Sequence, residues 1–132
     1  MSNKILIMEN DPAMCENIAE LLSISGYEVS TSYNGKDGLA KAIEFNPGLI
    51  LCDIMMPELD GYGVLSGRMN FPNLTSTPIV LLTAMSENKD RMKALACGAA
   101  GYLVKPFSDI ELLEIVSVLL NKKSCNSLQA EL

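Results

Sequence analysis

Five short segments with strand character, separated by helix-like stretches, constrain the fold of this 132-residue chain most strongly. Three of them (residues 5–8, 49–53 and 78–84) are almost continuously apolar, which is typical of parallel strands buried on both faces. Residues 27–33 alternate between apolar and polar, as an edge or half-exposed strand does, and residues 102–106 form the last run. Strands that alternate with helices predict an α/β domain with a parallel sheet covered on both faces.

The segments between these runs carry helix signals. Asp11 can cap a helix whose first turn contains Pro12. Asn34 and Asp37 resemble a capping box, and the helical spacing after them outweighs the alternative of a hairpin turn at the same place. We expect further helices near residues 61–69, 87–97 and 108–120.

Polar side chains stand at the ends of four of the predicted strands. They are Glu9 and Asn10, Asp53, Thr83 and Lys105. Because the carboxyl ends of parallel strands meet at one edge of a sheet, we expect these side chains to converge there. An acidic pocket suits a hard cation such as Mg²⁺, and a carboxylate can accept a phosphoryl group while a lysine and a hydroxyl hold its oxygens.

The composition argues against several classes of function. A net charge of -6, from 10 basic and 16 acidic residues, argues against direct nucleic-acid binding. The chain has no histidine, and Cys15, Cys52, Cys97 and Cys125 are widely spaced, so we expect neither a zinc site nor Ser-His or Cys-His catalysis. Because no apolar run reaches about 20 residues and the N-terminus lacks signal-peptide features, we expect a cytoplasmic protein that does not contact membranes.

The chain resembles the receiver domain of two-component response regulators. The resemblance covers about residues 3–121 and rests on "ILIMENDP", "LILCDIMMPELDGY", "PIVLLTA" and "GYLVKPF", in that order. It implies a doubly wound, flavodoxin-like sheet of five parallel strands in the order 2-1-3-4-5 with five helices, as in chemotaxis regulators. It also implies a sensor histidine kinase or a phosphotransfer protein as partner, and autocatalytic phosphorylation and dephosphorylation rather than conventional turnover.

The resemblance assigns the phosphoryl chemistry to four positions. Asp53 corresponds to the phosphoacceptor, which also contacts the metal. Glu9 corresponds to an acidic Mg²⁺ residue, and the backbone carbonyl of Met55 to a further ligand. Lys105 corresponds to the lysine that pairs with the phosphoryl group, and its bond to Pro106 is cis in the family.

Two further assignments from the resemblance concern switching. Thr83 corresponds to the switch hydroxyl, and Tyr102 to an aromatic residue that changes rotamer on activation. We expect phosphorylation to draw Thr83 toward the phosphoryl group and to let Tyr102 turn inward. This change would alter the surface of the 87–97 helix, the last strand and the last helix. The 87–97 helix is weakly apolar, so we expect it to be loosely held.

One position departs from the family pattern. Asn10 stands where a second acidic residue is expected, and Asp11 falls one place too late and is assigned to the helix cap. Asn10 offers a neutral carbonyl oxygen to the metal, so we expect Mg²⁺ affinity to be about tenfold to a hundredfold weaker. The alternative function is a pseudo-receiver, a protein-binding module with weak or no phosphorylation.

Two other functions fit the sequence less well. Enzymes that use an aspartyl intermediate on a small substrate carry a D-x-D arrangement, but Ile54 and Met55 follow Asp53. A flavin-binding domain would need a Ser/Thr/Gly-rich phosphate loop after the first strand, and none is present. Met55, Met56 and Met85 flank the predicted site and are interpreted as apolar fillers that tune water access.

The C-terminal part leaves two interpretations open. We expect the receiver domain to occupy residues 1–121, with residues 122–132 as a tail or the start of a linker. The last helix carries a wide apolar arc, which fits either core packing or a partner surface and allows a homodimer through residues 87–120. The residues of this arc and its flanks are Ile110, Leu112, Ile115, Val116, Val118, Leu119 and Leu120.

Overall fold

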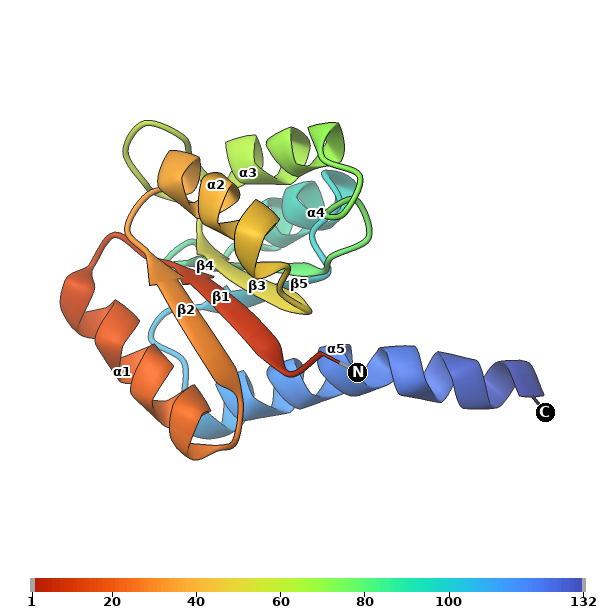
Figure 1. Cartoon of the computed structure of the whole chain (residues 1–132). Coiled ribbons are helices and arrows are strands. Elements are labelled where there is room, and N and C mark those ends of the chain that lie inside the picture. Colours follow the sequence, from red (N-terminus) through yellow and green to blue (C-terminus); the bar gives the residue numbers. More distant parts are fainter. Residues whose placement is uncertain (1, 132) are drawn as a thin grey trace.

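A computed structural model describes the backbone of residues 2–131 and the side chains of residues 2–121. These residues contain a five-stranded parallel sheet in the order β2-β1-β3-β4-β5, which confirms the expected doubly wound, flavodoxin-like fold (Figure 1). The strands are β1 (Lys4–Met8), β2 (Glu28–Ser32), β3 (Leu49–Asp53), β4 (Ile79–Thr83) and β5 (Gly101–Val104).

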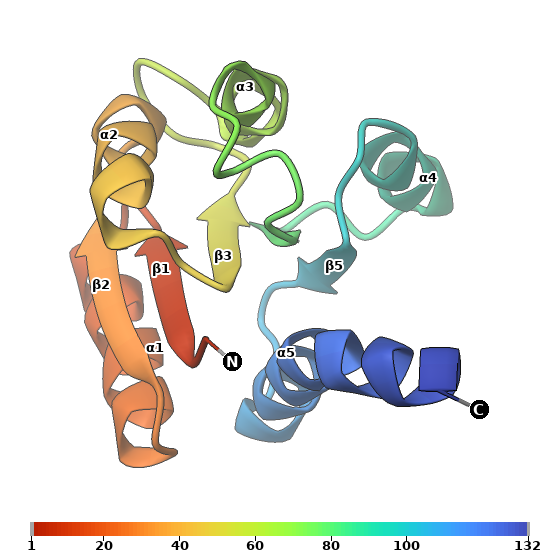
Figure 2. The same ribbon diagram turned by 45° about the vertical axis from the view of Figure 1, so that its right-hand side comes forward.

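Helices cover both faces of this sheet. Figures 1 and 2 show α1 and α5 on one face and α2, α3 and α4 on the other. The helices are α1 (Pro12–Ile24), α2 (Gly35–Phe45), α3 (Gly61–Gly67), α4 (Asn88–Ala96) and α5 (Asp109–Glu131), with a short 3₁₀ turn, η1 (Arg68–Asn70), after α3. Within the described part of the chain, no helix combines the length and the apolar character needed to cross a membrane.

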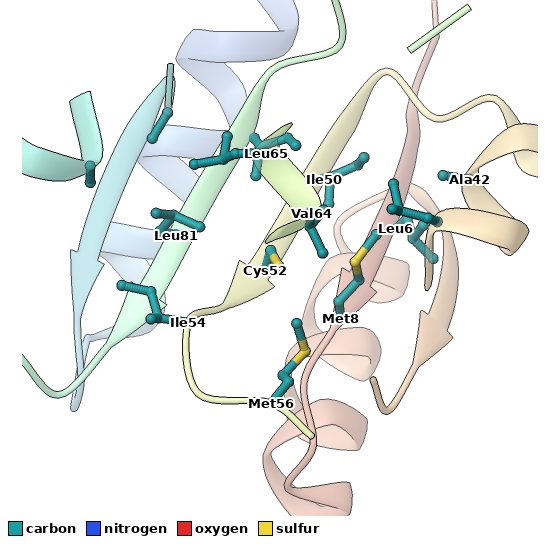
Figure 3. Close-up of a cluster of buried hydrophobic side chains, with 14 of the residues drawn as sticks. Leu6, Met8, Ala42, Ile50, Cys52, Ile54, Met56, Val64, Leu65 and Leu81 are labelled. Atoms are coloured by element: carbon teal, nitrogen blue, oxygen red, sulfur yellow. The ribbon is translucent and has the colours of Figure 1, made fainter. Parts of the chain in front are cut away.

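Two apolar clusters fix the strands in place. Leu6, Ile50 and Leu81 pack against α2, α3 and the loop after β3, as Figure 3 shows. The alternate residues of the same strands, such as Ile7 and Leu51, pack against α1 and α5. Burial of each such side chain contributes about 1.5–3 kcal/mol, so a slip in register would be costly. The residues at the strand ends are therefore held at defined positions.

The helix caps follow the sequence signals. The Asp11 carboxylate accepts hydrogen bonds from the backbone N–H groups of Ala13 (3.1 Å) and Met14 (3.5 Å) at the start of α1. The Asn34 side-chain oxygen accepts from the N–H of Asp37 at 2.8 Å, which confirms a helix start rather than a hairpin turn. Both caps satisfy N–H groups that a helix leaves unpaired at its N-terminus.

The last helix differs from its predicted extent. It was expected to end at residue 120, but α5 continues to Glu131. No glycine or proline occurs between residues 109 and 131, so neither of the strongest helix stop signals interrupts it. The side chains beyond residue 121, including that of Cys125, lie outside the described part. The boundary between a domain at 1–121 and a tail or linker at 122–132 stays a prediction.

Candidate functional site

The strand registers bring the predicted site residues to one edge of the sheet. Met8 on β1 pairs with Cys52 on β3, so the residues that follow them, Glu9 and Asp53, are neighbours. On the other side of β3, Asp53 pairs with Leu82, and Thr83 therefore ends β4 beside it. The site is thus assembled by backbone pairing of central strands that are buried on both faces.

Lys105 joins the two carboxylates of this pocket. Its Nζ lies 2.6 Å from Glu9 Oε1 and 3.4 Å from Asp53 Oδ1. Glu9 is fully buried and Asp53 is nearly so. Burial raises the pKa of Glu9, and the hydrogen bond from Lys105 acts against this rise. The positive charge of the ammonium group therefore offsets the repulsion between these two buried carboxylates.

Backbone N–H groups hold the other sides of the carboxylates. The N–H of Met55 donates to Asp53 Oδ1 at 3.3 Å, and the N–H of Asp11 donates to Glu9 Oε2 at 3.2 Å.

The Met55 side chain points into solvent with 65% of its area exposed, whereas Met56 is buried in the cluster of Figure 3. Met56 therefore packs as an apolar filler, whereas Met55 and Met85, the latter 41% exposed, do not.

Asn10 lies in the middle of this pocket. Its side-chain amide nitrogen, with two N–H donors, lies within hydrogen-bonding distance of three acceptors: Asp53 Oδ2 at 2.9 Å, the backbone oxygen of Met55 at 3.2 Å and Glu9 Oε2 at 3.2 Å. The opposite amide orientation would place its oxygen against the same three acceptors, so the hydrogen-bond network selects the nitrogen-inward orientation. From the sequence, Asn10 was expected to present its amide oxygen to the pocket, although an amide also carries two donors.

The pocket has the donor chemistry that Mg²⁺ requires. Glu9 Oε2, Asp53 Oδ2 and the carbonyl oxygen of Met55 all lie within 3.2 Å of the Asn10 amide, and all are hard oxygen ligands. In the described residues, no cluster of three or more His, Cys, Asp or Glu side chains is placed to hold a metal. A hard cation in this pocket would therefore be held by two carboxylates and a carbonyl, with waters to complete its shell.

Thr83 and Tyr102 are linked through Met85. Thr83 Oγ1 accepts a hydrogen bond from the backbone N–H of Met85 at 3.1 Å, and the Tyr102 hydroxyl donates to the backbone oxygen of Met85 at 2.8 Å. The Tyr102 ring lies inward with 5% of its area exposed, and the guanidinium of Arg91 lies 5.4 Å from the ring centroid. This is the inward position that we expected phosphorylation to favour.

The structure brings together Glu9, Asn10, Asp53 and Lys105 through direct contacts, whereas Thr83 contacts the loop after β4. The bond from Lys105 to Pro106 is cis, as the resemblance implied.

The family model for the response regulator receiver domain matches residues 5–117. This chain belongs to that family. Receiver domains act in two-component signalling, where phosphorylation by a histidine kinase is their general role and Mg²⁺ generally binds in the active site. The phosphoryl chemistry expected from the sequence is therefore the general chemistry of the family to which the chain belongs.

Known relatives of this receiver domain include transcriptional regulators. It is 39% identical over 120 residues to the probable transcriptional regulator ycf29 of Pyropia yezoensis, which is 91% of this chain and 54% of that protein. It is 34% identical over 119 residues to the DNA-binding dual master transcriptional regulator RpaA of Synechocystis, which is 90% of this chain and 49% of that protein. The chain spans about half the length of the curated relatives it matches.

A solved receiver domain gives a structural comparison. The receiver domain of the sensor histidine kinase PA1611 from Pseudomonas aeruginosa PAO1 matches with a TM-score of 0.82 and 30% identity. The match covers 92% of this chain and 99% of that chain. That crystal structure has a magnesium ion coordinated in its active-site cleft.

Proposed function

We propose that this receiver domain is a signalling switch that accepts a phosphoryl group on Asp53 from a sensor histidine kinase or a phosphotransfer protein. The observation that carries the proposal is the position of Asp53. It ends a buried strand, is nearly buried itself, and has the Lys105 ammonium 3.4 Å from one carboxylate oxygen. This partner class also leads us to infer a cytoplasmic location.

The transfer is a displacement at phosphorus. A carboxylate oxygen of Asp53 attacks the phosphorus of a phosphohistidine, the P–N bond breaks, and the imidazole leaves with the electron pair. Lys105 and the backbone N–H of Met55, which both contact Asp53 Oδ1, are placed to stabilise charge on the transferred group. Mg²⁺ bound by Glu9, Asp53 and Met55 would neutralise phosphoryl oxygens. Attack by water on the same phosphorus later breaks the P–O bond to Asp53 and resets the switch.

The signal would travel from the site through Met85. If the Thr83 hydroxyl turns to a phosphoryl oxygen, it gives up its hydrogen bond with the N–H of Met85. The carbonyl of the same residue accepts a hydrogen bond from the Tyr102 hydroxyl. A shift of Met85 therefore alters the position of the Tyr102 ring and its contact with the Arg91 guanidinium. The switch residues are thereby coupled to α4 and β5 through the N–H and the carbonyl of one residue, Met85.

The surface that changes would be the partner surface. Its exposed apolar residues fit a protein partner or a homodimer formed through residues 87–120. These residues, with at least half of their area exposed, are Met92, Leu95, Ile110 and Val118. Because the chain has more acidic than basic residues, we do not propose direct nucleic-acid binding by this domain.

Mass spectrometry after incubation with acetyl phosphate and Mg²⁺ tests the phosphoacceptor. We expect one phosphate adduct on the wild type and none on Asp53→Asn. Asp60→Asn is the matched control, because Asp60 is exposed and an asparagine can keep its cap on α3, so this variant should be modified like the wild type. An adduct on Asp53→Asn would refute the assignment.

The pseudo-receiver remains the alternative, and the position of Asn10 inside the pocket favours it. It predicts only a weak adduct or none on the wild type even at saturating Mg²⁺, together with a partner surface that works without phosphorylation. The wild-type measurement therefore decides between the two functions.

A further inference from the structure

All four carboxylate oxygens of the pocket have a donor partner from the chain itself. Glu9 Oε1 and Asp53 Oδ1 both face the Lys105 ammonium. Glu9 Oε2 accepts from the backbone N–H of Asp11, and Asp53 Oδ2 accepts from the amide of Asn10. Two buried acids would ordinarily leave lone pairs exposed to each other, which is costly at low dielectric. In this chain their hydrogen-bonding capacity is used.

The Asn10 amide nitrogen lies beside the point that a cation bound by these oxygens would occupy. It lies 2.9–3.2 Å from the three oxygens that form the ligand set. Ligands about 2.0–2.1 Å from Mg²⁺ in an octahedron lie about 2.9 Å from one another. The polar atom of Asn10 therefore stands at the spacing of a fourth ligand, although its nitrogen is a donor rather than a ligand.

The side chain is free to turn. Asn10 is exposed, so rotation of its amide does not disturb the core. The terminal torsion of asparagine is broad and roughly two-fold, so a half-turn exchanges the oxygen and nitrogen at almost the same positions. The nitrogen suits oxygen acceptors, whereas the oxygen suits a cation between those acceptors.

We propose that Asn10 is an internal substitute for the cation: its amide NH₂ binds Glu9, Asp53 and the Met55 carbonyl in the metal-free protein, and turns its oxygen inward when Mg²⁺ enters. The proposal rests on the proposed function, since it concerns the same pocket. An aspartate at this position has no donor and adds a third negative charge. Asn10 thus stabilises the metal-free pocket, and Mg²⁺ must displace these hydrogen bonds to bind.

The side-chain amide of Asn10 gives a direct test by NMR. Its two ¹⁵N-bound protons are assigned by their loss in Asn10→Asp. In EDTA we expect them to exchange slowly with water, and saturating magnesium chloride should shift them and accelerate their exchange. Rapid exchange in EDTA with no response to magnesium chloride would overturn the proposal.

Thermal unfolding in EDTA gives a second test. Asn10→Asp and Asn10→Ala both lose the donor, so each should lower the metal-free Tm. The expected shift is about 3–6 °C for each kcal/mol of unfolding free energy that the variant loses. Asn70→Asp, an exposed change in η1, should leave the Tm close to that of the wild type. Asn10→Asp should bind Mg²⁺ about tenfold to a hundredfold more tightly by calorimetry, and Asn10→Ala should not. An Asn10→Ala protein as stable as the wild type in EDTA would contradict the substitute role.

These readouts are separate from phosphorylation. If the amide responds to magnesium chloride as expected but no phosphate adduct forms on Asp53, the proposed function fails and the role of Asn10 stands. If the adduct forms but the amide and the metal-free Tm do not behave as expected, the role of Asn10 fails and the proposed function stands.

Discussion

At the scale of single residues, Lys105 carries the largest electrostatic role in the pocket. Because it is the cation that contacts both Glu9 and Asp53, Lys105→Met should leave the two acids facing each other with only neutral donors. We expect a loss of about 1–3 kcal/mol in the free energy of unfolding in EDTA, measured by urea denaturation. Phosphorylation by acetyl phosphate should also fall sharply.

Lys36→Met controls for the loss of a lysine, since Lys36 is exposed on α2. Its unfolding free energy should stay near that of the wild type. Equal stabilities for Lys105→Met and the wild type would mean that Asn10 and the backbone N–H groups neutralise the pocket without the ammonium.

The sequence indicates which residues form the site, but it does not indicate all the contacts that their side chains make. The convergence of Glu9, Asp53 and Lys105 could be predicted because parallel strands end at one edge. The donor role of Asn10 could not, because the sequence does not fix which way an amide points. Arg68 was also missed: it is buried, and its guanidinium donates to the backbone oxygens of Thr77 and, at 3.3 Å, Gly98. Nothing in the sequence around it distinguishes it from a surface arginine.

At the scale of elements, the N-terminus of α1 must serve two purposes. Asp11 caps the helix with its side chain, while its backbone N–H binds Glu9. Asp11→Ala should lower the unfolding free energy by about 0.5–2 kcal/mol, because the cap is lost. Asp11→Ser keeps a capping oxygen and should recover most of this loss, as measured by urea denaturation.

Calorimetric titration separates the cap from the metal site. Neither Asp11 variant should change Mg²⁺ affinity by more than a few-fold, since the side chain faces the helix N–H groups. A large loss of affinity in both variants would show that Asp11 supplies the charge that Asn10 lacks, against its assignment as a cap.

Element boundaries follow from the sequence only where it contains a stop signal. Gly26, with a φ of 99°, follows α1 and adopts the left-handed conformation that favours glycine. Asn46, with a φ of 52°, ends α2 just before Pro47. Beyond residue 120 the sequence has no glycine or proline, and α5 continues past Asn121 and Asn126, so its end was predicted too early.

At the scale of the whole molecule, the two faces of the sheet are unequally anchored. On one face, α1 and α5 each place at least three buried apolar side chains on the sheet. On the other face, α4 contributes one buried residue, Ala94, while Met92 and Leu95 remain exposed. A helix with so little burial opens at low free energy, so α4 is the element best suited to move.

Hydrogen exchange with and without beryllofluoride, a phosphoryl mimic, tests whether this mobility is used. The mimic should bind at Asp53, attract the Thr83 hydroxyl and release Met85, so exchange should change across residues 84–107. A few kcal/mol of differential interaction is enough to shift such an equilibrium. The buried amides of β1 and β3 provide an internal control and should keep their protection, and the effect should vanish in Asp53→Asn. Unchanged exchange in residues 84–107, with beryllofluoride binding verified by fluorine NMR, would show that α4 and β5 do not respond to a phosphoryl mimic at Asp53.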